Sequence, residues 1–234
     1  MKLLVRSLVT CAAFGAAIQL HAQSTVALDP GQTWLGYMNW FEIPANGGGY
    51  VSGGTWAPAD LTAAFSGINL TLGPNSINDP ASYWYTPSGQ AGATGNKIMD
   101  ASFYVETTGL YSGQNLTFTA DVLANTLVGQ TDANGNGWSA VAFIKDFAPD
   151  YSSSVSATAP LVDGVFNVSL NTIADPTRHV QYGFEVKGPD VWITDVGNYG
   201  TIQVAPVPEP TSMALMGAGA LTLLAVRRFN GRKA

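Results

Sequence analysis

Alternation of apolar and polar residues in several separate stretches limits this chain to an all-β fold. In residues 116–122 every second residue is apolar, namely Leu116, Phe118, Ala120 and Val122, and the residues between them are polar. The same period of two recurs in three other stretches, 101–106, 166–170 and 180–186. Successive side chains of a strand point to opposite faces, so each stretch is predicted to bury one face and expose the other.

Turn-forming residues separate these stretches, and together they indicate an antiparallel β-sandwich. Residues 180–204 also resemble, in a general way, the jelly-roll domains common in secreted carbohydrate-binding modules. Gly, Pro, Asn and Asp bound each stretch, as strands require. Residues 139–147 are apolar more continuously, which predicts a central strand buried on both faces. Residues 58–65 favour one short turn of helix with Asp60 near its start, and no long amphipathic helix is predicted between residues 23 and 205.

The N-terminal end has the pattern of a secretory signal peptide. Lys2 and Arg6 precede an apolar run from Leu8 to Leu20, and a small residue, Ala22, marks the predicted cleavage point. Cys11 is the only cysteine of the chain, so cleavage leaves a body without a thiol. That body can form neither a disulfide nor a cysteine-based metal site.

The C-terminal end has the pattern of a short transmembrane helix. Residues 211–226 carry no charge, and as a helix of 16 residues they would span roughly 24 Å. Arg227 and Arg228 follow at once and are expected to remain in the cytoplasm, which places the body across the membrane. The chain therefore divides into a signal peptide (1–22), a β-sandwich domain (23–205) and a C-terminal segment (206–234).

The body is strongly acidic. It contains four basic and fifteen acidic residues, a formal charge of −11, because the other basic residues lie in the two terminal segments. Repulsion from phosphate groups argues against a nucleic acid as a partner.

The C-terminal segment resembles the PEP-CTERM sorting signal of Gram-negative bacteria. The matching parts are Pro208-Glu209-Pro210, the apolar run 211–226 and the Arg227-Arg228 pair. The resemblance implies that an exosortase, a membrane cysteine protease, cuts the chain near Pro208–Pro210. It also implies passage through the export machinery, anchoring in the inner membrane during transit, and a final place at the cell surface or in the extracellular matrix. Such proteins commonly accompany genes for exopolysaccharide production.

Aromatic residues are concentrated in the first half of the body, and two interpretations of them are open. The four that suit a glycan-binding surface are Trp34, Tyr37, Trp40 and Trp84. Flat aromatic rings stack on the apolar faces of sugars, and Tyr and Trp add a polar edge. The alternative is that these rings fill the core between two sheets.

Alternate oxygen-bearing residues in the stretch 132–137 match the first half of a calcium-binding loop. Asp132, Asn134 and Asn136 precede Gly137, as in the D-x-[DN]-x-[DN]-G pattern. The position of the usual bidentate Glu holds Phe143 instead, and Asn-Gly pairs also favour a simple turn. Calcium and a metal-free turn are therefore both open, and no other cofactor is expected.

No catalytic constellation is evident, so we expect a protein that is not an enzyme. A Ser–His–Asp triad would require His179, and no nucleophile-elbow motif is present. Asp100 and Glu106 lie on one predicted strand about 20 Å apart, too far for a glycosidase pair. The leading hypothesis is an exported surface or matrix protein that binds polysaccharide. The alternatives are a structural surface component without a ligand and a secreted polysaccharide hydrolase.

Overall fold

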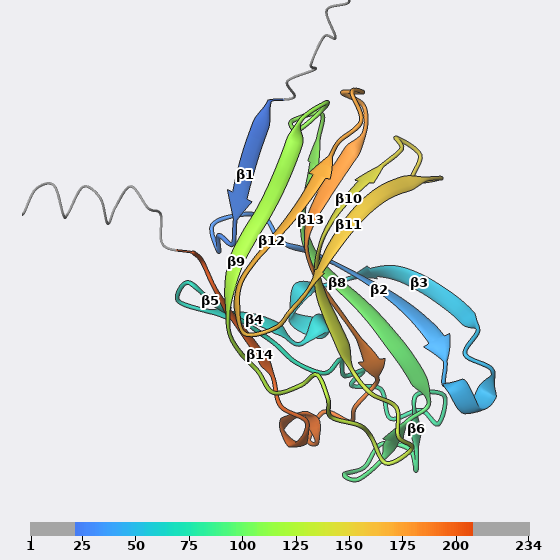
Figure 1. Cartoon of the computed structure of the whole chain (residues 1–234). Helices are drawn as coiled ribbons and strands as arrows, with labels where there is room; N and C mark the ends of the chain where they lie inside the picture. Colours follow the sequence, from blue (N-terminus) through green and yellow to red (C-terminus); the bar gives the residue numbers. More distant parts are fainter. Residues whose placement is uncertain (1–21, 208–234) are drawn as a thin grey trace, which may run out of the picture.

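The computed structural model describes residues 22–207, which form two packed β-sheets and one short strand pair (Figure 1). The strands are β1 (Gln23–Ala27), β2 (Leu35–Glu42), β3 (Tyr50–Trp56), β4 (Ala63–Ser66), β5 (Asn69–Leu72), β6 (Tyr85–Thr86), β7 (Thr94–Gly95), β8 (Lys97–Thr108), β9 (Asn115–Asn125), β10 (Ser139–Phe147), β11 (Ser154–Pro160), β12 (Gly164–Asn171), β13 (His179–Pro189) and β14 (Ile202–Ala205). Three short 3₁₀ turns complete the elements: η1 (Pro44–Asn46), η2 (Pro58–Leu61) and η3 (Val196–Asn198). Within residues 22–207, no helix combines the length and apolar character needed to cross a membrane.

One sheet, the β9 sheet, is organised around its longest strand. β12 pairs with one edge of β9, and β1 and β14 share the other edge end to end. β14 continues through β5 to β4. β1 runs parallel to β9, which differs from the fully antiparallel sandwich that we expected. The edge of β9 that β1 occupies is free because β14 ends at Ala205, before Pro206.

The other sheet, the β8 sheet, has the order β11-β10-β13-β8-β2-β3 and is antiparallel throughout. Its inner face carries the core residues of β8 and β13, and its outer face carries the residues that alternate with them. Tyr37, Asp100, Glu185 and Lys187 all lie on this outer face, because their neighbours Met38, Ala101 and Val186 belong to the core.

Aromatic side chains join the two sheets. Phe118 of β9 lies 5.3 Å, between ring centroids, from both Tyr182 and Phe184 of β13. Trp34, just before β2, stacks on Phe103 of β8 at 4.6 Å and also lies 5.7 Å from Phe65 of β4 in the other sheet. Aromatic rings bury large apolar areas, and these contacts therefore form the centre of a continuous core.

The predicted all-β fold class is confirmed. The four alternating stretches correspond to β8, β9, β12 and β13, and the continuous stretch corresponds to β10. In β10, Phe143 and Ile144 point to opposite faces and both are fully buried, as expected for an inner strand. The short helical turn around Asp60 is η2.

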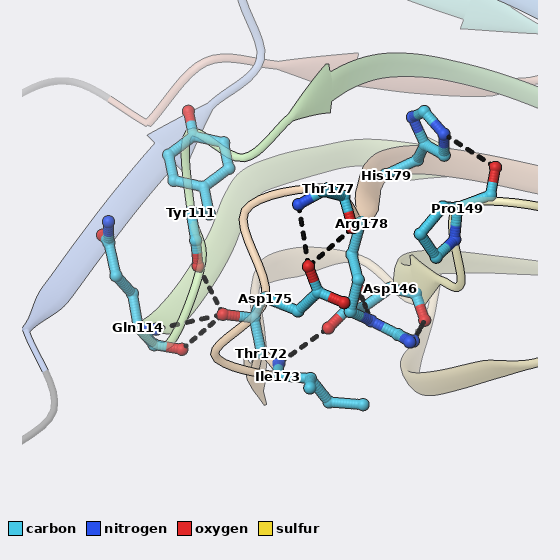
Figure 2. A network of polar contacts seen from close by, with 10 residues as sticks. All are labelled: Tyr111, Gln114, Asp146, Pro149, Thr172, Ile173, Asp175, Thr177, Arg178 and His179. Atoms are coloured by element: carbon cyan, nitrogen blue, oxygen red, sulfur yellow. Dashed lines mark hydrogen bonds and ion pairs between the residues drawn. The ribbon is translucent and has the colours of Figure 1, made fainter.

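A buried ion pair holds the β12–β13 loop against β10 (Figure 2). The Asp146 carboxylate is 0% exposed and accepts hydrogen bonds from Arg178 Nε at 2.8 Å and from the Ile173 backbone N–H at 2.7 Å. Arg178 Nη2 also donates to the Asp146 carbonyl oxygen at 2.8 Å. Both charges are therefore compensated, as burial of charged groups requires.

Replacing Arg178 with Ala is expected to lower the free energy of unfolding by about 3–5 kcal/mol, because Asp146 would remain buried without a cation. Urea unfolding followed by circular dichroism measures the loss. The matched control is Lys145→Ala, which removes the partner of Glu185 from an ion pair whose two side chains are 23% and 24% exposed, and it is expected to cost less than about 1 kcal/mol. Equal losses in the two variants would contradict the structural role given to Asp146.

Candidate functional site

A cavity of about 580 Å³ opens at one end of the β8 sheet. Its floor comes from the ends of three neighbouring strands: Phe41 and Glu42 of β2, Ile98 of β8, and Lys187 and Gly188 of β13. Its walls come from the β2–β3 loop and from the segment that leads into β10. Antiparallel pairing brings the end of β2 beside the beginning of β8 and the end of β13, so this convergence follows directly from the sheet order.

A pair of aromatic rings, the aromatic rim, lies on the β2–β3 side of the cavity: Phe41 lines the cavity, and Tyr50 packs on Phe41. Phe41 and Tyr50 are cross-strand partners whose ring centroids lie 5.5 Å apart in an edge-to-face arrangement. The β2–β3 register shifts between Trp40 and Phe41, which locally bends the strand pair. Tyr50 is 62% exposed, so a large part of an aromatic ring faces solvent beside the cavity.

The charged groups at the cavity are paired. Lys187 Nζ lies 4.3 Å from the centroid of the Phe41 ring and 3.4 Å from Asp100 Oδ2. Glu42 Oε2 accepts a hydrogen bond from Lys97 Nζ at 3.1 Å. Burial, followed by the nearby Glu185 carboxylate, raises the pKa of Asp100 above its ordinary value, and Lys187 opposes that shift. The floor is therefore close to electrically neutral.

The stretch predicted as a calcium loop forms one wall of the cavity. Gly135, Asn136 and Gly137 line it, and Asp132 lies buried behind them. Asp132 Oδ1 accepts hydrogen bonds from the backbone N–H groups of Asn134 and Asn136, and Oδ2 accepts one from Asn136 Nδ2. Both carboxylate oxygens thus stabilise the turn itself.

Calcium binding by Asp132, Asn134 and Asn136 stays a prediction. Across the described part of the chain, no three His, Cys, Asp or Glu side chains are grouped so that they could hold a metal ion. The Asn-Gly turn alone explains the local conformation, since Gly135 has a positive φ of 79°.

Behind the cavity, the end of β13 packs tightly against Trp138. A Cβ atom at position 188 would lie 2.2 Å from Trp138 Cδ1, so only glycine fits there. Asp190 follows, 1% exposed, and its Oδ1 accepts a hydrogen bond from the Lys97 backbone N–H at 3.1 Å. Burial raises the pKa of Asp190 to about 7.

The four aromatic residues predicted as a glycan surface do not come together on one face. Trp34 stacks on Phe103 in the core, and its Nε1 donates to the Asp29 carbonyl oxygen at 2.9 Å. Trp40 and Trp84 contact each other edge to face at 5.8 Å and pack, partly buried, against the core. Tyr37 lies on the opposite face of β2 from Trp40, because the two lie three positions apart and successive side chains alternate between the faces.

The residues of the cavity rim were missed because they are spread over the sequence. Phe41 and Glu42 directly follow Trp40, but Tyr50 lies beyond a run of three glycines and Lys187 beyond a further 136 residues. A linear motif cannot represent such a set. His179 lies at the other end of β13, where its ring stacks on Tyr151 at 4.7 Å and its Nδ1 lies 2.8 Å from Thr108 Oγ1.

Comparison with known families identifies one segment of the chain. Residues 206–228 match the PEP-CTERM protein-sorting motif, which begins directly after β14. The motif marks an exported protein that is anchored in the membrane in transit and processed by an exosortase. No curated protein and no solved structure matched the chain.

Most residues of the motif lie outside the described part of the chain. These include the predicted sorting residues Pro208, Glu209, Pro210, Arg227 and Arg228, and the predicted transmembrane helix. The predicted signal peptide also lies outside it, apart from Ala22.

The raised pKa of Asp190 predicts a stability that falls as the pH rises. An unfolded Asp loses its proton near pH 3.8, whereas folded Asp190 keeps it up to about pH 7. Between these values the folded state binds more protons, so the free energy of unfolding decreases with pH, and this contribution is constant above that window. Asp190→Asn cannot ionise and is expected to be more stable than the wild type at pH 8 by roughly 2–4 kcal/mol, but not at pH 3.

Urea unfolding of both proteins at a series of pH values measures this difference. Asp60→Asn, which changes an exposed acid, is the matched control and should follow the wild-type pH dependence. Parallel pH profiles for the wild type and Asp190→Asn would show that Asp190 is already ionised in the fold.

Proposed function

We propose that the body of this exported protein binds polysaccharide outside the cytoplasm, through the cavity at the end of the β8 sheet. The sorting motif supports the setting of this activity, because it directs the chain out of the cell and into exosortase processing. The ligand class is proposed from the chemistry of the cavity alone, and the sorting motif carries no information about it.

The observation that carries the proposal is the exposed aromatic rim beside a cavity that has both apolar and polar lining residues. Tyr50 is 62% exposed, and its ring packs in an edge-to-face arrangement with Phe41, which lines the cavity. Sugar rings present apolar C–H faces that stack on such rings, while the tyrosine hydroxyl provides a hydrogen-bonding edge. The Phe41 contact restricts the Tyr50 ring before a ligand arrives, which reduces the entropy lost on binding.

The rest of the cavity offers hydrogen-bonding groups at a size suited to short oligosaccharide segments. Its lining includes the side chains of Glu42, Asn136, Ser139 and Lys187. Ligand cavities of proteins typically measure about 300–1,000 Å³, and this one, at about 580 Å³, lies within that range. Because the cavity is open along the sheet end, a long polymer need not thread into it, and only a segment has to bind.

The hydrolase alternative finds less support at this cavity. Among the described residues that line it, Glu42 is the only carboxylate, and it is paired with Lys97. Glycoside hydrolysis ordinarily needs two carboxyl groups about 5–10 Å apart around the scissile bond. The alternative of a structural surface component without a ligand predicts that changes at Tyr50 leave every binding measurement unaltered.

Tyr50→Ala is expected to weaken polysaccharide binding about fivefold to tenfold, because loss of one stacking ring is worth roughly 1 kcal/mol or slightly more. Affinity electrophoresis through gels that contain individual polysaccharides measures the change. Tyr151→Ala is the matched control, since Tyr151 is also exposed but lies in the β10–β11 hairpin at the other end of the sheet. Equal retardation of all three proteins in every gel would exclude this rim as the binding surface.

Deletion of residues 208–234 is expected to separate targeting from binding. The deleted chain should no longer associate with membranes in the exporting cell, because the sorting motif is incomplete. The purified product should bind the same polysaccharide as the intact protein, because residues 22–207 contain the entire cavity. Membrane fractionation and affinity electrophoresis test the two halves of this prediction independently.

A further inference from the structure

Every basic residue in the described part of the chain is engaged in an ion pair. Residues 22–207 contain four lysines and arginines in all. The N···O distances are 3.1 Å for Lys97–Glu42, 2.7 Å for Lys145–Glu185, 2.8 Å for Arg178–Asp146 and 3.4 Å for Lys187–Asp100. Eleven of the fifteen acidic residues are left without a cation.

The accessible members of these pairs lie on the outer face of the β8 sheet, and one of them, Lys187, lines the cavity. Lys145 and Lys187 belong to the outer face of the β8 sheet, and each has a carboxylate partner on a neighbouring strand. Arg178 is buried against Asp146, and Lys97 is buried beneath Glu42 and the Tyr83 ring. Lys187 has the most exposed cationic side chain of the four, at 42%, and it is the one that lines the cavity.

This arrangement disfavours an acidic ligand in two ways. An incoming carboxylate would have to displace Asp100 from Lys187, or remain close to Asp100 and Glu185 without a cation of its own. It would also approach a body with a formal charge of −11, and this long-range repulsion slows association at low ionic strength.

We infer that the ligand of the cavity is an uncharged polysaccharide, and that the protein excludes polymers that carry uronate, sulfate or phosphate groups. The inference rests on the proposed function and specifies the ligand class for it. Hydroxyl groups of a neutral sugar hydrogen-bond to Asn136, Ser139 and the ion-paired Glu42 without breaking either ion pair at the cavity. Stacking on Tyr50 and Phe41 does not depend on charge, so binding should be nearly independent of salt.

The test compares three classes of polymer with the purified full-length chain. Uncharged probes are a glucan, a mannan and a galactan; the acidic probe is polygalacturonate, and the cationic probe is chitosan. Retardation in affinity gels is measured at about 20 mM and about 300 mM NaCl, because electrostatic attraction is long-ranged only at the lower concentration. We expect binding to at least one uncharged polymer that changes less than about twofold with salt, and no binding to polygalacturonate at either concentration.

Asp100→Asn tests whether ion pairing is what excludes acidic ligands. The substitution frees Lys187 at the cavity, and we expect retardation by polygalacturonate at about 20 mM salt that is lost at about 300 mM. The matched control is Asp60→Asn, which alters the net charge equally but lies on η2, away from any cation pair. The control should show no such retardation.

The outcomes separate the inference from the proposed function. If the wild type binds none of the polymers, the proposed function is wrong. If it binds polygalacturonate, or binds only chitosan and loses this binding in salt, the protein does bind polysaccharide but the assignment to uncharged ligands is overturned. If Asp100→Asn and Asp60→Asn behave alike towards polygalacturonate, the ion pair at Lys187 is not the cause of the selectivity.

Discussion

The packing of aromatic rings between the two sheets is the interaction on which the rest of the structure depends. Phe118 of β9 contacts Tyr182 and Phe184 of β13, and Trp34 stacks on Phe103 of β8. These contacts fix which face of the β8 sheet is buried, because a shift of register by one residue would turn every ring towards solvent. The outer face and the strand ends that form the cavity take their positions from this constraint. The candidate site is thus a product of the core, although none of the interlocking rings named here lines it.

Sequence analysis predicted the strands that bury one face and expose the other, and it missed several strands without this pattern. β8, β9, β12 and β13 bury one face, and their alternation made them evident. β2 and β3 were not evident, because β2 carries aromatic residues on both faces and β3 contains the pair Gly53-Gly54. The parallel pairing of β1 depends on where β14 ends, which is a tertiary circumstance that no local pattern expresses.

The site was less accessible to sequence analysis than the fold, for a physical reason. The aromatic residues of the first half predicted either a binding surface or a core. Trp34, Trp40 and Trp84 pack against the core, whereas Phe41 lines the cavity and Tyr50 packs on Phe41. Whether a ring is buried depends on strand register and on the bulge after Trp40, and neither can be predicted from the amino-acid composition. Similarly, the acidic balance of the body was plain from the sequence, but the pairing of all four described cations required the strands to be placed side by side.

The end-to-end arrangement of β1 and β14 on one edge of β9 has a mechanical consequence for export. β14 borders the sorting motif, which starts at the residue after Ala205, and β1 borders the predicted signal peptide, because it starts at the residue after Ala22. Only Pro206 and Val207 separate β14 from residue 208, and a fully extended chain of three residues spans at most about 10 Å. While the chain is anchored in the membrane during transit, the folded body would therefore lie close to the lipid headgroups. An exosortase would have to reach its cleavage site through the narrow space between the body and the membrane.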